Sequence, residues 1–229
     1  MFEKVFSDRE RTNFLKYYET SLILYLCERM PAWITPNRLT AIGVLGSLLV
    51  FAGFWLGHYL RIALLISIIG LAVNWFGDSL DGRLAYYRNI PRKWYGFCLD
   101  IVVDWLSMFL VVMGFYVYFD TYRWLPFVFL LAYGGLMLIA LLRYKITDSY
   151  SIDAFQLGPT EMRIIIAVLI LIEIIRRGTL LQASMLGAVI ILFFTIMALR
   201  SLLQAADWKD QQEKAALAAE QTTDVSEQS

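Results

Sequence analysis

The chain has 229 residues, of which 59% are hydrophobic and 17% are charged, and its mean hydropathy is +0.59. A soluble domain has about 45–50% apolar and about 25% charged residues, so a soluble monomer of this size could not bury so much apolar surface. The 20 basic and 20 acidic residues cancel, which argues against a nucleic-acid-binding protein. The two cysteines, Cys27 and Cys98, lie far apart in apolar stretches, a pattern typical of neither a disulfide framework nor a zinc site. The composition therefore predicts an integral membrane protein.

Residues 1–36 are predicted to form an N-terminal amphipathic helix and the loop that follows it. Apolar and aromatic residues recur at helical spacing from Phe14 to Leu26, and Pro31 and Pro36 then redirect the chain. Acidic residues mixed with basic ones, and no early apolar run, argue against a signal peptide. We expect this helix to lie in the membrane interface, and a helix that packs on the bundle is the alternative.

Six apolar segments follow, each close to the about 20 residues that a helix needs to cross the hydrocarbon core. The predicted spans are 38–60, 62–88, 94–119, 124–143, 160–176 and 178–203. The fifth is the shortest, and Glu173 interrupts it near its end. Residues 207–229 are polar and rich in Ala, Gln and Glu, so we expect a fraying helix and a disordered tail there. The sequence thus predicts an all-α fold, with six transmembrane helices in residues 37–206.

Lys and Arg are unequally distributed between the two sides of this bundle. With six spans both termini share one side, and that side has 16 of the 20 Lys and Arg residues. The remaining four are Arg61, Arg123, Arg176 and Arg177. Because cytoplasmic loops carry the excess of positive residues, we expect both termini and the 78–104 region to face the cytoplasm.

Four aspartates lie near the ends of two consecutive predicted spans. Asp78 and Asp81 are three residues apart, and Asp100 and Asp104 are four residues apart, so each pair shares one face of its helix. The short basic connection 89–93 predicts that the two helices are antiparallel neighbours. The four carboxylates are therefore expected to converge near the cytoplasmic mouth of the bundle.

Ionised carboxylates at membrane depth need a functional reason, because each costs about 2.5–3.5 kcal/mol even on the lenient insertion scale. Either some are protonated or divalent cations neutralise them, and hard oxygen ligands suit Mg²⁺, Mn²⁺ or Ca²⁺. Mg²⁺ completes its shell with water and substrate phosphates, which indicates phosphate chemistry. The nearby Gly82, Ala85 and Gly96 remove side-chain bulk, which serves either close helix packing or the approach of a ligand to the backbone.

At these residues the sequence resembles the CDP-alcohol phosphotransferase (phosphatidyltransferase) family. The family signature is D-x2-D-G-x2-A-R, then eight or nine residues, then G-x3-D-x3-D. This chain matches it at Asp78, Asp81, Gly82, Ala85, Gly96, Asp100 and Asp104. The signature arginine falls at position 86, where this chain has Tyr86, so Arg83 or Arg88 would have to supply the missing charge.

The resemblance implies a metal-dependent enzyme that transfers a substituted phosphate from a CDP-linked lipid donor, such as CDP-diacylglycerol, to a small polar alcohol and releases CMP. It implies two Mg²⁺ (or Mn²⁺) ions and a possible homodimer. The implied metal ligands are Asp78, Asp81, Asp100 and Asp104, with Asp104 also the catalytic base. The implied nucleotide-binding residues are Asn37, Thr40, Gly82, Ala85, Tyr86 and Gly96.

Four charged residues are weaker candidates for binding the acceptor. Glu161 and Arg163 open the fifth span, where ordinary helix capping explains them equally well. Arg143 and Lys145 end the fourth span, where positive-inside charge is the plainer explanation. Transfer from a CDP-choline or CDP-ethanolamine type of donor to a lipid alcohol, a transporter and a non-catalytic scaffold stay open as other functions.

Overall fold

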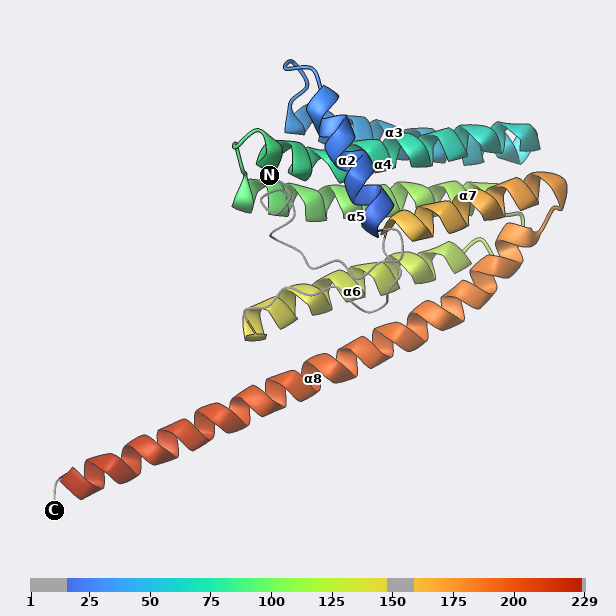
Figure 1. Cartoon of the computed structure of the whole chain (residues 1–229). Helices are drawn as coiled ribbons and strands as arrows, with labels where there is room; N and C mark the ends of the chain where they lie inside the picture. The colour runs from blue at the N-terminus through green and yellow to red at the C-terminus, as the bar shows by residue number, and fades with distance from the viewer. Residues whose placement is uncertain (1–15, 148–158, 228–229) are drawn as a thin grey trace. The chain divides into compact units, whose positions relative to one another are not determined.

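The computed structural model describes residues 16–147 and 159–227, with side chains described for 17–147 and 159–215. Within these ranges the chain is helical and has no strand, so the predicted all-α fold is confirmed for them. The elements in chain order are α2 (Lys16–Arg29), α3 (Pro36–Tyr59), the short 3-10 helix η1 (Arg61–Ala63), α4 (Leu64–Tyr87), α5 (Lys93–Tyr118), α6 (Leu125–Thr147), α7 (Pro159–Ile175) and α8 (Thr179–Glu227) (Figure 1). Residues 1–15, the first part of the predicted N-terminal helix, lie outside the described residues.

Within the residues that the structure describes, five helical segments are long and apolar enough to cross a membrane, and the chain is a multi-pass membrane protein. These are Pro36–Tyr59, Arg61–Tyr87, Lys93–Tyr118, Leu125–Thr147 and Thr179–Ala215. The fifth predicted span, 160–176, is not among these five; it corresponds to α7, which has 17 residues and is therefore about 26 Å long, slightly less than the hydrocarbon core. Beyond residue 203, α8 continues through the polar segment to Glu227, because Ala, Gln and Glu are strong helix formers.

The chain divides into two compact units. Of the described residues, the first unit comprises 16–130 and 159–188, and the second comprises 131–147 and 189–227. In the second unit, Arg143 Nη1 of α6 donates to Ser201 Oγ of α8 at 3.5 Å, and Lys209 Nζ donates to the carbonyl oxygen of Ile146 at 2.7 Å. These bonds hold the end of α6 against α8 within that unit.

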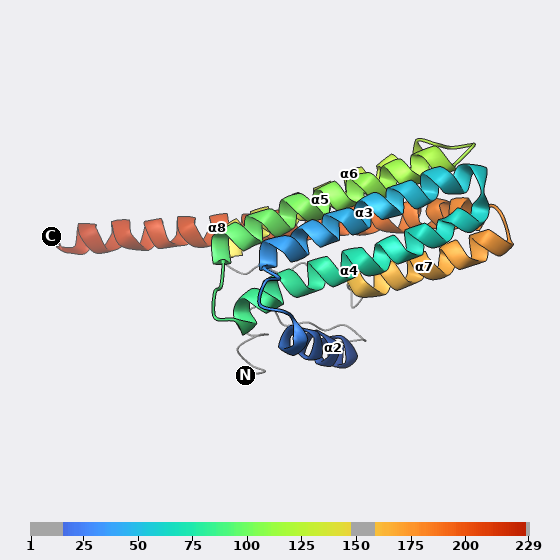
Figure 2. The same ribbon diagram turned by 90° about the horizontal axis from the view of Figure 1, so that it is seen from above.

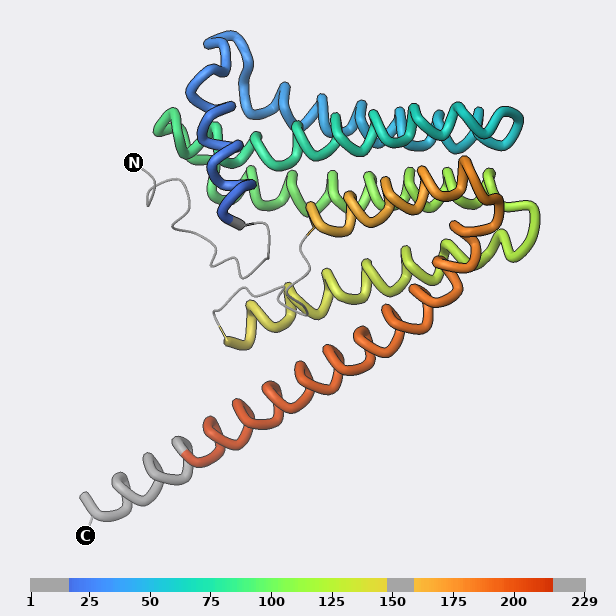
Figure 3. Tube along the Cα trace, turned by 45° about the vertical axis from the view of Figure 1, so that its right-hand side comes forward, coloured from blue at the N-terminus to red at the C-terminus, as the bar shows by residue number. Residues whose placement is uncertain are grey.

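In the first unit, α3 and α4 run side by side at backbone contact distance (Figures 2 and 3). A Cβ atom added at Gly46 of α3 would lie 2.2 Å from the backbone nitrogen of Asn74, and one added at Gly77 of α4 would lie 2.2 Å from that of Gly43. Small residues allow the two helix backbones to approach closely. Close packing matters in a membrane because lipid tails are as apolar as the side chains, so burying apolar surface between helices gains little free energy. The α3–α4 contact fixes the position of Asp78, which directly follows Gly77.

Helix α2 crosses α4 near the end of the bundle that contains Asp78 (Figure 1). Its buried face, with Ile23 and Cys27, packs against a cluster that includes Leu39, Leu80 and Leu84. Its opposite face exposes aromatic and apolar side chains, namely Tyr17, Tyr18, Leu22 and Tyr25. The helix therefore packs on the bundle through one face, and an interfacial position for its other face stays a prediction.

Burial raises the pKa of the Cys27 thiol from its ordinary value of 9.0 to about 11. Because the folded state holds this proton more tightly, the group favours folding below about pH 9, and the contribution is lost as the pH rises to about 11. Since the thiolate is the reactive form, we expect a Cys98→Ser variant to react slowly with maleimide at pH 8 and faster toward pH 11. Mass spectrometry of the adduct measures this, with the SDS-unfolded protein as the fully reactive control. Rapid labelling of the native variant at pH 8 would contradict the buried position of Cys27.

Candidate functional site

Three carboxylates meet at one end of the first unit. Asp78 of α4 and Asp100 and Asp104 of α5 each place one oxygen within 4.8 Å of the other two, and all three side chains are half-buried. Helix α3 packs against both α4 and α5, whereas α4 and α5 have little direct backbone contact. The predicted convergence is therefore observed for three of the four aspartates, although α3, rather than direct α4–α5 packing, holds the two helices in place.

Arg163 of α7 neutralises one of these carboxylates. Its Nη2 donates to Asp78 Oδ2 at 2.6 Å in an ion pair, and its Nε donates to Asn74 Oδ1 at 3.0 Å. The two ion-paired side chains are only 17% and 22% exposed, so the pair is shielded from water. The sequence made Arg163 a weaker candidate for binding the acceptor, and the structure places it at the aspartates.

A buried chain of hydrogen bonds continues from this pair into the bundle. Asn74 Nδ2 donates to Ser47 Oγ at 3.0 Å, and Ser47 Oγ donates to Ser107 Oγ at 2.8 Å. The chain joins α7, α4, α3 and α5, and thereby holds Asp78 and Arg163 in one arrangement. Sequence reasoning missed these residues. The available signal was Asn74 itself, a polar residue in an apolar run, four positions before Asp78 and on the same helix face.

Asp81 is not part of the group of three carboxylates in the described structure. Its Oδ2 accepts a hydrogen bond from Thr40 Oγ1 of α3 at 2.5 Å, and its Oδ1 accepts one from the backbone nitrogen of Gly82. Thr40 is buried between α3 and α4. The structure thus pairs a predicted metal ligand, Asp81, with a predicted nucleotide-binding residue, Thr40.

The three small residues of the motif lie in different surroundings. A Cβ atom added at Gly82 would meet nothing within 4 Å, and one added at Gly96 would meet only Arg92 Cβ at 3.6 Å. Ala85 is buried, with 2% of its surface exposed. Helix packing within the chain therefore accounts for Ala85 but gives no reason for Gly82.

Two arginines near the motif, Arg88 and Arg92, form hydrogen bonds to groups other than Tyr86. Tyr86 is half-buried, and Arg83 is buried at 6% exposure. The Arg88 guanidinium donates to four backbone carbonyl oxygens of the α2–α3 connection, those of Met30, Pro31, Ala32 and Ile34. Arg92, which the sequence analysis did not single out, donates through Nη1 to Asn37 Oδ1. Arg88 therefore anchors a loop, and Arg92 is the cation beside the predicted nucleotide-binding Asn37.

The remaining acceptor candidates are dispersed. Glu161 is buried at 7% exposure on α7, where the adjacent Thr160 Oγ1 donates to Glu19 Oε1 of α2 at 2.7 Å. Arg143 and Lys145 belong to the second unit, and Lys145 is exposed there. Of the four candidates, Arg163 is the one that contacts an aspartate of the group in the described residues.

Comparison with known proteins adds two findings. Residues 33–198 match the family model described as CDP-alcohol phosphatidyltransferase. The chain is also similar to an archaetidylinositol phosphate synthase from Pyrococcus horikoshii, with 44% identity over 81 residues. That alignment covers 35% of this chain and 40% of the relative, so the chain spans less than half the length of the relative it matches.

Proposed function

The chain belongs to the CDP-alcohol phosphatidyltransferase family, and we propose that it transfers a substituted phosphate from a CDP-linked donor to an alcohol acceptor in phospholipid synthesis, with release of CMP. The observation that supports this most directly is the group formed by Asp78, Asp100 and Asp104. Three carboxylates contributed by two candidate membrane-spanning helices are suited to diphosphate chemistry that depends on divalent ions.

The donor set fits a hard divalent cation such as Mg²⁺ or Mn²⁺. Oxygens on opposite sides of a Mg²⁺ ion lie about 4.2 Å apart, since each bond is about 2.1 Å long, and the three carboxylate oxygens lie within 4.8 Å of one another. We propose that Asp78, Asp100 and Asp104 hold one ion and that Asp81 contributes to a second. Bound ions would polarise the donor diphosphate and stabilise the negative charge on departing CMP.

The protein side chains then orient the reactants and move one proton. The acceptor hydroxyl oxygen attacks the phosphorus that carries the substituent, the bond from that phosphorus to the CMP oxygen breaks, and CMP leaves with the bonding electrons. We assign the hydroxyl proton to the Asp104 carboxylate, which acts as the general base. Asn37, Thr40, Tyr86 and Gly96 are assigned to the nucleotide side.

Arg163 is suited to bind a phosphate on the acceptor. Its Nη2 and Nε are held by Asp78 and Asn74, and its Nη1 makes no hydrogen bond to the residues that the structure describes. A guanidinium held on two sides presents its remaining nitrogen in a fixed direction, which favours phosphate recognition. The acceptor roles of Glu161, Arg143 and Lys145 stay predictions.

The similar synthase is named for a lipid product that contains inositol phosphate. By analogy we propose that the lipid of this chain's reaction is on the CDP-linked donor, as in CDP-diacylglycerol, and that the acceptor is a small polar alcohol. A cytoplasmic position for both termini and for the aspartates is part of the proposal, supported by the distribution of Lys and Arg. A homodimer stays a prediction.

A panel of substrates tests this function. Purified protein with Mg²⁺ receives CDP-diacylglycerol together with glycerol phosphate, inositol phosphate or free inositol, or receives CDP-choline or CDP-ethanolamine together with diacylglycerol. Released CMP and the lipid product, identified by mass spectrometry, are measured. Release of CMP only with CDP-diacylglycerol supports the proposal. Release of CMP only with CDP-choline or CDP-ethanolamine would show instead that the lipid is the acceptor. No CMP in any mixture, with divalent ions still bound, would indicate a non-catalytic relative.

Replacing Gly82 by Ala tests its assignment to the nucleotide. Because the added methyl group would meet nothing within 4 Å, the variant should fold with an unchanged melting temperature. If the donor nucleotide approaches this backbone, the methyl group occupies its space, and we expect KM for the CDP-linked donor to rise about tenfold while KM for the acceptor stays constant. An unchanged KM for the donor would remove Gly82 from the nucleotide site.

A further inference from the structure

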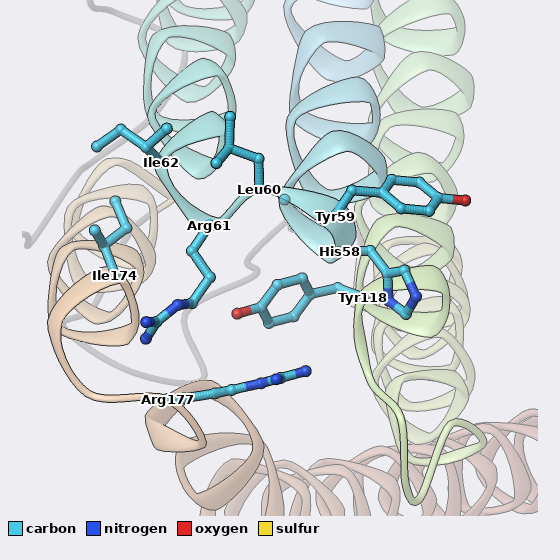
Figure 4. A pocket seen from close by; sticks show the side chains of 9 residues that line it. His58, Tyr59, Leu60, Arg61, Ile62, Tyr118, Ile174 and Arg177 are labelled. Atoms are coloured by element: carbon cyan, nitrogen blue, oxygen red, sulfur yellow. The ribbon is translucent and has the colours of Figure 1, made fainter.

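The end of the bundle opposite the aspartates contains a cavity that the proposed reaction does not use. It has a volume of about 440 Å³, within the range of small-molecule sites. The cavity lies where α3 passes through η1 into α4, beside the end of α5 and the turn from α7 to α8 (Figure 4). Asp104 and the cavity-lining Tyr118 are 14 positions apart on α5, so the cavity lies about 21 Å along that helix from the aspartates, where two candidate membrane spans are joined.

Two guanidinium groups enter this cavity from different elements, Arg61 from η1 and Arg177 from the α7–α8 turn (Figure 4). Arg177 Nη2 forms a 2.6 Å ion pair with Asp120 Oδ2, so one side of Arg177 is already neutralised. Arg61 forms no ion pair with the residues that the structure describes, and its side chain is exposed. Arg61 is thus the positive charge of the cavity that is left to bind a ligand.

A second acidic residue bonded to the cavity wall, besides Asp120, is the buried Glu173. Glu173 is 1% exposed, and its Oε1 accepts hydrogen bonds from the Tyr118 hydroxyl and from the backbone nitrogen of Gly178, each at 2.9 Å. Its Oε2 accepts from the backbone nitrogen of Leu180 at 2.8 Å. Glu173 therefore caps the start of α8, where Gly178 has a φ of +95°, and its charge is directed into the turn.

Part of the remaining cavity wall is apolar, and the rest includes His58, Tyr59 and Tyr118. Leu60 and Ile62, on either side of Arg61, are 63% and 52% exposed, and Ile174 adds a third apolar side chain. A cation flanked by exposed aliphatic side chains at a membrane boundary matches a ligand with a phosphate and acyl chains. We propose that this cavity binds the phosphate group of an anionic membrane lipid in the leaflet opposite the aspartates, with Arg61 as the principal contact.

Native mass spectrometry of the detergent-purified full chain tests this site, with dioleoylphosphatidylglycerol as the probe. We expect Arg61→Gln to retain the lipid about tenfold more weakly, the effect of losing one charge-assisted hydrogen bond, and Arg61→Lys to retain it better than Arg61→Gln. Arg176→Gln is the matched control, because Arg176 is an exposed neighbour of Arg177 that does not line the cavity. Asp104→Asn should retain the lipid fully, so this test and the test of the transfer reaction can fail separately.

Additional ligands distinguish a lipid from a soluble anion. Dioleoylglycerol, which lacks the phosphate, should not be retained through Arg61, and millimolar inorganic phosphate should not displace the lipid. Equal loss of lipid in Arg61→Gln and Arg176→Gln would reduce the effect to general surface charge and overturn the proposal. Complete displacement by inorganic phosphate would overturn the lipid assignment. An Arg61→Gln variant with the wild-type melting temperature and unchanged lipid retention would remove the site.

Discussion

Asp104→Asn is expected to lower the rate of CMP release by about 10²–10⁴-fold, the usual contribution of a positioned general base. Asparagine has the size of aspartate but cannot take up a proton, so the loss would reflect chemistry and not packing. Asp104 lies in the group with Asp78 and Asp100, and removal of one negative charge there also relieves repulsion, so the fold should persist. The measurement is steady-state CMP release with saturating donor and acceptor.

Two comparisons show whether Asp104 acts as the base. Asp210→Asn, which changes an exposed carboxylate of α8, should leave the rate unchanged. Raising the Mg²⁺ concentration should not restore Asp104→Asn, whereas a variant impaired only in metal binding should recover. A variant that retains about a tenth or more of the wild-type rate at saturating Mg²⁺ would exclude Asp104 as the base.

Gly77→Ala is expected to destabilise the α3–α4 pair by about 3 kcal/mol or more, the upper part of the range for overpacking. The added Cβ would lie 2.2 Å from the Gly43 nitrogen and 2.4 Å from the Leu39 carbonyl oxygen, both backbone atoms that cannot move aside alone. The helices would have to separate, and the adjacent Asp78 would move away from Arg163. We expect a fall in melting temperature together with loss of CMP release.

Gly135→Ala is the matched control for this substitution. The new Cβ would lie 3.7 Å from Thr195 Cγ2, an ordinary van der Waals contact, so melting temperature and activity should be preserved. Thermal unfolding in a constant detergent, followed by tryptophan fluorescence, compares the two variants. A Gly77→Ala protein that melts like wild type would contradict backbone contact between α3 and α4 in the membrane.

The helices were predictable because their signals are local. The first predicted span, 38–60, corresponds to α3 at Pro36–Tyr59, and the small shift at its start has a local cause. Thr35 Oγ1 accepts a hydrogen bond from the backbone nitrogen of Arg38, and Pro36 occupies the first turn. The family resemblance drawn from the aspartate motif is confirmed for the same reason, since a motif of fixed spacing needs no tertiary information.

The contacts between helices were not predictable from spacing alone. Asp78 and Asp81 share a helix face, but positions three apart differ in direction by about 60°, and α3 lies close enough for Thr40 to bind Asp81. The pair of Arg163 and Asp78 joins residues 85 positions apart in the chain, which no local periodicity encodes. Position 86 is a second example of contacts that spacing does not predict. Arg88 was a candidate to replace the signature arginine, but its guanidinium donates hydrogen bonds to the α2–α3 connection.

The shortness and charge of α7 also affect biogenesis. This helix has 17 residues and carries Glu161, Arg163 and Glu173, so its transfer from the translocon into lipid alone would be unfavourable. Arg163 and Glu173 find their partners on α4 and α5, helices synthesised earlier. We therefore expect a nascent chain to gain its reactive centre only when α7 docks on the helices that were synthesised before it.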